Sequence, residues 1–476
     1  MTAVSEPSDA TTPAATTNGA ATNGAAPIQV KPGRHREATL YHALAGAGDG
    51  DGRTLAQLRQ AALAAYEASE LPVWRRSGFW TTSLQSLDLD ALSTRPSPLP
   101  DSVPDVVART LADRPRAGRI VQSAGSVVHV ELNRELAAKG VILCSLEDAF
   151  SEHGELVAPW YSKRLTIDRN KLEAANAAFW TGGAFLHVPE GLVVEDPFEI
   201  VYAIDSPGVA QYGRTLVVGA PTSEFRVHEY DLAEDFDGQA LHAGAFELYL
   251  QDGARCRLAQ VQDWGQGEVF DASTRFVGVG RDAHCHWLPS LLGGHLVRQH
   301  LELAVSEPGG DMAFRGLFFT EEQEHLDVFA VDLHETGPSG GDVHWRGAAT
   351  GESRASFEGL IQIDPGAQQT HTYLQIHSMM LSPKARVDAI PSVLVSSDDV
   401  SASHGGTVGE LDETAIFYMQ TRGLDRPAAV RVIVEGFFEP LISELEDEPL
   451  EELVRAKVAG KLAAAREDIE AYATSR

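Results

Sequence analysis

Residues 252–292 read DGARCRLAQVQDWGQGEVFDASTRFVGVGRDAHCHWLPSLL, and this stretch decides the fold. It holds two copies of one arrangement: a tight polar turn, an alanine, and a run in which apolar and polar residues alternate. Such alternation is typical of a β-strand with one buried face. Ala254 and Ala283 stand 29 residues apart, and a turn at Gly309–Gly310 follows about one such step later. The spacing indicates a structure that repeats once per coil.

The same arrangement continues in both directions, from about residue 183 to residue 410. Short alternating runs are separated by Gly- and Asp-rich spacers with few helix signals: RVHEYDL, AFELYL, LVRQHLELAV, MAFRGLFF, SFEGLIQI and QTHTYLQI. Corners with a small residue recur at DPGAQ (364–368) and SPKAR (382–386). A β-sandwich would alternate similarly, but it gives less reason for small residues at recurring corners. We therefore favour a mainly β fold whose core, residues 183–410, is a β-solenoid.

Helical patterns flank this core on both sides. Region 46–182 is mixed, with a helix that Thr54 can cap, helical stretches at 103–114, 145–153 and 170–180, and a strand over 120–132. Residues 411–476 predict a C-terminal helical domain, in which Asp412 can cap the first helix and Pro449 suits the first turn of the last.

The N-terminal residues 1–45 are mostly Ala, Thr, Asn, Gly, Ser and Pro. Such a segment buries too little apolar surface to offset its ordering entropy, so we expect a disordered tail. The GAGDGDG stretch (46–52) that follows is typical of a flexible joint.

Charge and cysteine content exclude several classes of function. The formal net charge is −30, from 38 basic and 68 acidic residues, whereas nucleic acids and anionic membranes attract clustered Lys and Arg. Cys144, Cys256 and Cys285 are too few for a four-cysteine metal site, and their roles stay open.

The N-terminus does not resemble a signal peptide, and no stretch reaches ~18 apolar residues. We expect a cytoplasmic protein without a membrane span.

Common catalytic motifs do not fit this chain. GPSGG (337–341) matches G-x-S-x-G, but the helix that a nucleophile elbow requires does not follow, so a glycine-rich turn is favoured. Walker A, HExxH and Rossmann motifs are absent, so any ATP dependence must come from a partner. Alternation puts His284 and His286 on one strand face and Cys285 on the other, and two imidazoles alone seldom hold a metal.

Two later stretches carry the other candidate histidines. In QTHTYLQIHSMM (369–380), alternation puts His371, Tyr373, Gln375 and His377 on one face, as a wet surface or a partner-facing edge. In SSDDVSASHGGTVGELDE (396–413), the single His404 precedes two glycines that allow a tight reversal or a close approach by another backbone. Asp398 and Asp399 could hold its imidazole in one tautomer, but no nucleophile or second ligand is evident nearby.

Several stretches resemble the SufB/SufD family of iron–sulfur cluster assembly proteins, and most of all its SufD members. DDVSASHGGTVGELDETAIFYMQTRGL (398–424) is similar to the family motif DDV-x-C-S-H-G-A-T-x-G-x-L-D-E with a following F-Y-x-x-x-R-G. VIVEGFFEPLISELEDEPLEELV (432–454) resembles the family's C-terminal helices. ANAAFWTGGAFLHVPEGLVVEDPFEI (175–200) resembles the entry to its β core, and LPVWRRSGFWTTSL (71–84) a weaker N-terminal motif.

The resemblance implies a right-handed parallel β-helix between N- and C-terminal helical regions, acting as a scaffold subunit rather than an enzyme. It implies pairing with a SufB-like subunit through the β-helices, although a homodimer stays possible, and binding of a SufC-like ATPase through the C-terminal helices. The cargo would be a nascent iron–sulfur cluster, transient and shared with the partner, with none expected in isolation. His404 falls at the position implied to act on that cluster in trans, as a metal ligand at the subunit interface.

The resemblance also implies which residues lie at interfaces, and this sequence differs from the family motif at one position. His371 and His377 would lie at the pairing surface, and Phe437, Phe438, Leu441 and Ile442 at the ATPase contact, unless the phenylalanines instead close the end of the β-helix. Ala402 stands where the family motif has cysteine, so a thiol is lost there.

Two other hypotheses stay open beside this one. A β-helix could belong to a polysaccharide-active enzyme of the secreted type, or to a purely structural solenoid.

Overall fold

The computed structural model describes residues 55–76, 80–94, 101–111, 114–265, 267–466 and 469. The predicted disordered tail, the flexible joint at 46–52 and the proposed cap Thr54 lie outside these residues. The N-terminal elements outside the main sheets are α2 (Leu55–Ala68), β1 (Val73–Arg76), β2 (Trp80–Ser83), η1 (Leu89–Ala91), α3 (Asp105–Thr110), α4 (Arg134–Ala138), α5 (Leu146–Glu152), α6 (Gly154–Val157) and α7 (Lys171–Phe179).

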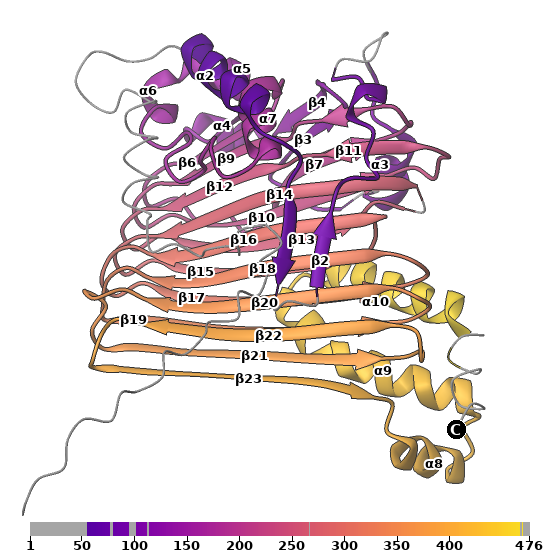
Figure 1. Cartoon of the computed structure of the whole chain (residues 1–476). Helices are drawn as coiled ribbons and strands as arrows, with labels where there is room; N and C mark the ends of the chain where they lie inside the picture. Colours follow the sequence, from indigo (N-terminus) through magenta and orange to yellow (C-terminus); the bar gives the residue numbers. More distant parts are fainter. Residues whose placement is uncertain are drawn as a thin grey trace, which may run out of the picture.

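Two long sheets face each other and form the body of the molecule (Figure 1). Sheet 1 has ten strands: β3 (Gly118–Ser123), β4 (Ser126–Leu132), β7 (Phe198–Ile204), β10 (Glu224–Ala233), β13 (Arg255–Asp263), β15 (His284–Leu291), β17 (Asp311–Thr320), β19 (Ser339–Ala349), β21 (Thr370–Met380) and β23 (Val400–Glu410). Sheet 2 has eleven: β5 (Ile142–Cys144), β6 (Ala184–Val188), β8 (Ala210–Gln211), β9 (Arg214–Gly219), β11 (Gln239–His242), β12 (Ala245–Leu250), β14 (Glu268–Val279), β16 (Leu296–Val305), β18 (His325–His334), β20 (Arg354–Ile363) and β22 (Arg386–Val395).

From β12 onward the chain alternates between the sheets, so that each coil adds one parallel strand to each of them. The result is a parallel β-solenoid of about 8 turns, which confirms the predicted mainly β fold. Strands from before residue 183 also join the sheets, because β3 pairs with β7 in parallel and β5 pairs with β6 in antiparallel. The predicted single strand over 120–132 is wrong: β3 and β4 form an antiparallel hairpin that turns at Ala124–Gly125.

The predicted repeat is visible in the register of sheet 1. Arg255 of β13 lies directly opposite His284 of β15, one residue after each corner alanine. Ala254, Ala283 and Ala367 are fully buried, and the N–H of each donates to the carbonyl three residues earlier at 3.0–3.3 Å. The corner side chain therefore points into the core, where only a small residue fits beside the turn.

Aromatic rings stack along the axis between the two sheets. Trp287 lies 4.8 Å from Phe314, Phe314 lies 5.5 Å from Trp345, and Trp345 lies 4.5 Å from Phe357, measured between ring centroids. Trp287, Phe314 and Trp345 belong to successive strands of sheet 1, and Phe357 lies opposite on sheet 2, so the apolar core is continuous from one coil to the next.

The C-terminal helices lie against the outer face of sheet 1 (Figure 1). They are α8 (Glu413–Thr421), α9 (Arg426–Ile442), the short η2 (Ser443–Leu445) and α10 (Glu448–Ala464). The predicted cap is confirmed, because the Asp412 carboxylate accepts from the N–H groups of Thr414 and Ala415 at 2.8 and 3.2 Å. Pro449 lies in the first turn of α10, as predicted. No helix in the described part of the chain is long and apolar enough to cross a bilayer.

Arginines from three different coils bind the turn between α9 and α10. Arg226 of β10 donates to the Glu446 carbonyl at 2.8 Å, and Arg257 of β13 donates to the Glu444 carbonyl at 2.6 Å. Arg315 of β17 donates to the Glu444 carboxylate at 2.9 Å. The helical hairpin is thus attached to several coils of sheet 1 at once.

The apolar residues predicted for an ATPase contact are mostly inside the protein. Phe438, Leu441 and Ile442 are at most 2% exposed and pack between α9, α10 and sheet 1, while Phe437 is partly buried. The Phe438 ring lies 6.2 Å from that of Phe319 in β17. Three of the four therefore serve packing, and none of these three can touch a partner in this conformation.

Phe438→Ala should lower the free energy of unfolding by about 3–5 kcal/mol, because it leaves a cavity between α9 and sheet 1. Urea unfolding followed by circular dichroism measures the loss. Val432→Ala, at an exposed position on the same helix, is the matched control and should change stability by less than about 0.5 kcal/mol. Equal effects of the two substitutions would contradict this account of α9.

Candidate functional site at the open end of the β-helix

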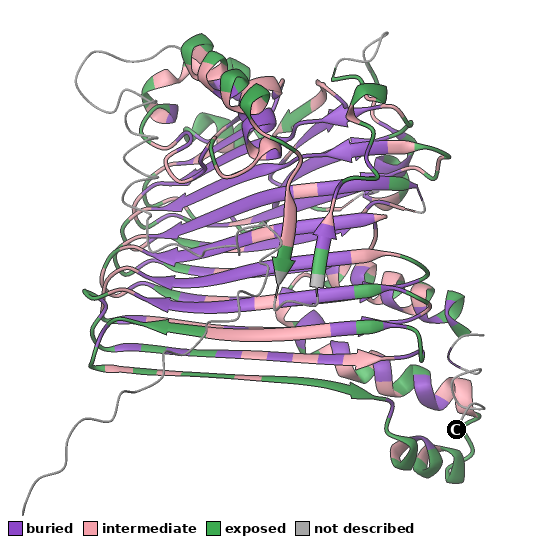
Figure 2. Ribbon diagram, in the orientation of Figure 1, coloured by how far each residue is buried: buried purple, intermediate pink, exposed green. Residues whose placement is uncertain are grey.

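The β-helix ends on two uncovered strands. In the described chain β22 pairs only with β20, and β23 only with β21, so each has one edge without a strand neighbour. Figure 2 shows the change in burial, from mostly buried strands in the first coils to exposed and intermediate residues in β22 and β23. Edges of this kind are normally protected, because they can pair with another chain.

His404 lies on the inward-facing row of this last coil. It is in register with Leu374 of β21, just as Ala402 is in register with Thr372. Leu374 and Thr372 are buried inside the β-helix, and in-register parallel strands point equivalent side chains to the same side. No described strand follows β23 in sheet 1, so the His404 side chain is exposed although it is directed along the interior row.

Gly405 and Gly406 form neither the tight reversal nor the close backbone approach that their sequence allows. Both lie in the middle of β23, and neither has a positive φ. A Cβ at Gly406 would lie 3.5 Å from Cγ of Pro391 in β22, which is ordinary contact, so no steric clash requires glycine there. The chain leaves the sheet only after Glu410, and residues 400–410 therefore present a straight edge strand.

The predicted support of His404 by Asp398 and Asp399 is also wrong. Asp399 precedes β23, and four extended residues lie between it and His404, a separation of about 16 Å. The Asp399 backbone instead closes the corner: its carbonyl accepts from the Gln369 N–H at 2.6 Å, and its N–H donates to the Gln368 side chain at 2.8 Å.

Apolar side chains surround His404 on the same inward row. We use the term mouth for the inward-facing residues of the last coil: Val400, Ala402, His404, Gly406 and Val408 of β23, with Ala389, Pro391, Val393 and Val395 of β22. Val393 and Val408 are 37% and 39% exposed, although they continue rows that are buried in every earlier coil. An exposed patch that extends a core in this way marks an interaction surface.

The mouth holds a single imidazole and no thiol. No group of three or more His, Cys, Asp or Glu side chains in the described chain could hold a metal ion. The cysteines lie in earlier coils, Cys144 in β5, Cys256 in β13 and Cys285 in β15. Burial raises the pKa of Cys144 to about 12 and raises those of Cys256 and Cys285 further, so these thiols stay protonated and are poor ligands.

The other candidate histidines face a different direction. The predicted alternation in β21 is confirmed: Thr370, Thr372, Leu374 and Ile376 are buried, and His371, Tyr373, Gln375 and His377 face outward. His377 Nδ1 lies 2.6 Å from the Thr407 hydroxyl on β23, and partial burial lowers its pKa. The structure therefore does not bring His371 and His377 together with His404. They remain predicted contacts on the outer face.

The sequence analysis did not identify two exposed aromatic residues as surface candidates. Phe417 and Tyr418 on α8 are 67% and 58% exposed, while Ile416 beside them is buried. Figure 1 shows α8 at the end of the molecule where β23 finishes. Three consecutive helical residues, 416–418, span about 200° around the axis, which is wider than one buried stripe, so they cannot all face the core, and this was the available signal.

The GPSGG motif and the His284–His286 stretch both form parts of strands. Ser339 of GPSGG begins strand β19 and no helix follows, which confirms that it is not a nucleophile elbow. Its hydroxyl is buried between His334 Nδ1 at 2.9 Å and the Thr370 hydroxyl at 2.8 Å. His284 and His286 lie outward with Cys285 inward, as predicted.

Comparison with known proteins identifies the family to which this chain belongs. Residues 202–437 match the profile described as "SUF system FeS cluster assembly, SufBD core domain", and residues 117–200 match the "SufBD protein N-terminal region". The iron–sulfur cluster assembly protein SufB of Bacillus subtilis is 23% identical over 390 residues, covering 79% of this chain and 84% of the relative. A SufBD family protein of Staphylococcus epidermidis is 24% identical with the same coverage.

The core match begins within β7 and ends within α9, and it contains His404 and the mouth. The polysaccharide-active enzyme and the purely structural solenoid receive no support from these matches. The chain belongs to the SufBD family of iron–sulfur cluster assembly proteins.

Proposed function

We propose that this chain is a SufD-like scaffold subunit of a SufBCD-type complex, and that its mouth pairs with a SufB-like subunit. The observation that carries the proposal is the position of His404, an exposed imidazole on the inward row of an uncovered last coil. A second β-helix stacked on that coil would cover the apolar mouth and enclose the imidazole. His404 would then meet the nascent iron–sulfur cluster, the cargo of the complex, at the joint between two subunits.

The ligand set supports a site completed in trans. Iron–sulfur clusters are held mainly by cysteine thiolates, and imidazole can replace thiolate on some irons. His404 offers one imidazole, Ala402 offers no thiol, and the three cysteines lie in distant coils. The partner would supply the thiolates, and His404 would supply one nitrogen ligand.

The same reasoning favours a heterodimer. A second copy of this chain would bring a second His404 to the joint but no thiol, because its own mouth also has Ala402. A cysteine-bearing SufB-like subunit completes the set, whereas a homodimer leaves it with two imidazoles.

The ATPase contact is proposed on α8 rather than on the buried residues of α9. Phe417 and Tyr418 are large, exposed and adjacent, and aromatic residues of this kind are common anchors in protein interfaces. Arg422 stacks over Tyr418 at 5.1 Å and would belong to the polar rim. A SufC-like ATPase bound here would lie beside the joint, since α8 follows β23 directly.

Anaerobic co-expression with a SufB-like subunit and a SufC-like ATPase tests the proposal. We expect the three chains to co-purify, and the complex to show the visible absorption of an iron–sulfur cluster together with bound iron and sulfide. A chain that purifies alone from this mixture contradicts the scaffold role. A complex of two copies of this chain that carries a cluster without the SufB-like subunit contradicts the heterodimer.

A further inference from the structure

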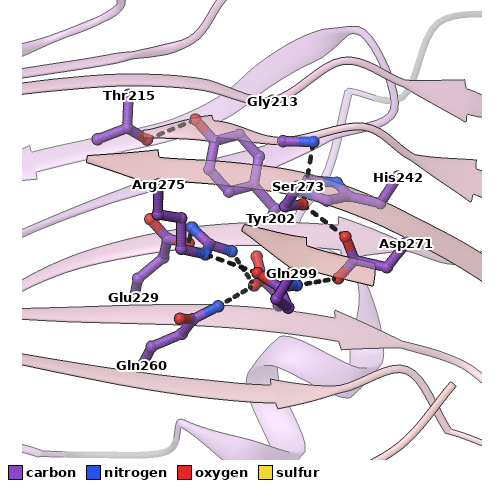
Figure 3. Close-up of polar contacts among 12 residues, drawn as sticks. Tyr202, Gly213, Thr215, Glu229, His242, Gln260, Asp271, Ser273, Arg275 and Gln299 are labelled. Atoms are coloured by element: carbon purple, nitrogen blue, oxygen red, sulfur yellow. Dashed lines mark hydrogen bonds and ion pairs between the residues drawn. The ribbon is translucent and has the colours of Figure 1, made fainter. Parts of the chain in front are cut away.

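A group of buried polar side chains interrupts the apolar interior of the first coils (Figure 3). We use the term polar chamber for these residues: Tyr202 of β7, Glu229 and Asp231 of β10, Gln260 and Gln262 of β13, His242 of β11, Asp271, Ser273 and Arg275 of β14, and Gln299 of β16. Each is at most 3% exposed. The chamber lies between the two sheets, many coils away from the mouth, and the proposed function makes no use of it.

The chamber holds more carboxyl groups than cations. Arg275 is its only guanidinium; Nη2 lies 2.8 Å from Asp231 Oδ2, and Nη1 donates to Glu229. Asp271 has no cationic partner within hydrogen-bond distance in the described chain, and it accepts from Ser273 at 2.5 Å and from Trp264 and Gln299 at 2.9 Å. Three ionised carboxylates around one guanidinium would leave two buried negative charges without compensation, which is very costly.

The unsatisfied atoms of the chamber are all acceptors. Oε2 of Glu229, Oδ1 of Asp231, Oε1 of Gln260 and Oε1 of Gln262 are buried without a hydrogen-bond donor. Glu229 is in register with Gln260, and Asp231 with Gln262, so these oxygens line two neighbouring rungs. What the chamber lacks is donors, and a proton on a carboxyl group supplies one while removing a negative charge.

We propose that the folded β-helix keeps a proton on Glu229, and that the polar chamber is a pH-sensitive element which weakens the first coils when this proton leaves. Protonation of the unpaired Oε2 removes a buried negative charge, and Glu229 Oε1 continues to accept from Arg275. Arg275 and Asp231 then form a balanced pair, with Asp271 held by neutral donors.

The groups that face Glu229 come from every neighbouring strand and agree with this charge state. Burial raises the pKa of Glu229 to about 8 and that of Asp271 to about 7, against the opposing effect of Arg275. Burial also raises the pKa of Asp231. Tyr202 stays protonated because burial raises its pKa, and His242 stays neutral because burial lowers its pKa well below the usual value.

The direction of the pH effect follows from proton linkage. A carboxyl group whose pKa is raised in the folded state binds its proton more tightly there than in the unfolded chain. The stabilisation is complete below the unfolded pKa of about 4.5, and it is lost as the pH rises through about 8. We therefore expect the urea midpoint of the full chain to fall between pH 5 and pH 8.5, and the fall in Glu229→Gln to be smaller, because among the carboxyl groups of the chamber only Asp231 and Asp271 then keep a raised pKa.

Difference infrared spectroscopy of the full chain detects the proton directly. At pH 7.5 the wild type should show the C=O band of a protonated carboxyl group, and Glu229→Gln should lose most of it. Glu247→Gln is the matched control: Glu247 is equally buried but is paired with one guanidinium, Arg214, at 2.8 Å, and its removal should leave the band intact.

Several outcomes would overturn the proposal. The first is a wild-type band that has disappeared by pH 7, which decides the matter even if Glu229→Gln does not fold. The second is a band that is equal in Glu229→Gln and the wild type. The third is the absence of the band together with a midpoint that rises with added K⁺ or Mg²⁺, since a cation rather than a proton would then balance the chamber.

Discussion

His404→Ala should leave the three-subunit complex assembled and reduce its cluster content roughly tenfold or more. The substitution removes the only imidazole of the mouth, and loss even of groups that merely support metal ligands costs about 10–100-fold in affinity. The side chain is exposed and has no structural neighbour on a following strand, so folding and pairing should not change. Iron and sulfide content and visible absorption of the anaerobic complex measure the effect.

His284→Ala is the matched control for that experiment. His284 is also an exposed imidazole on sheet 1, but it faces outward on β15 and has no assigned partner contact. It should retain the cluster. Equal cluster content in His404→Ala and the wild type would refute the assigned role, and an equal loss in both variants would show that the direction of the side chain does not matter.

A negative charge inside the mouth should weaken pairing with the SufB-like subunit about a hundredfold. Val393→Asp and Val408→Asp each place a carboxylate on the inward row, where a stacked β-helix would bury it without a partner. The cost of burying an unpaired charge is about 3 kcal/mol or more, which corresponds to roughly a hundredfold increase in Kd. Size-exclusion chromatography and calorimetric titration of the two subunits measure this increase.

Val130→Asp separates this effect from a general loss of solubility or stability. Val130 is also an exposed valine on a strand, but it lies on β4 at the opposite end of sheet 1. It should pair with wild-type affinity. If Val393→Asp and Val408→Asp also paired with wild-type affinity, the mouth would not be the pairing surface.

The solenoid was predictable because its causes are local. Corner alanines such as Ala254 and Ala283 repeat with the coil, and alternation along β21 correctly separated buried Thr372 and Leu374 from outward His371. Both signals arise from one strand and its turn, so a single sequence carries them.

The direction of His404 was not predictable, because it depends on register with a strand thirty residues earlier, and its exposure depends on the lack of a further sheet 1 strand among the described residues. Gly405 and Gly406 suggested a turn, yet tertiary pairing holds them in an extended strand. The polar chamber was hidden for a related reason. In RVHEYDL the alternation suggests that charged residues face water, but Glu229 and Asp231 point inward, while Tyr230 and Leu232 point outward and are covered by the C-terminal helices.

The arginines that fasten the α9–α10 turn affect how the protein carries mechanical load. A solenoid whose coils touch only their neighbours can stretch like a spring, one coil at a time. Here Arg226, Arg257 and Arg315 tie one helical hairpin to coils that are several steps apart along the axis. A force applied to α9 or α10 is therefore distributed over the coils that these three arginines connect, and those coils resist separation together.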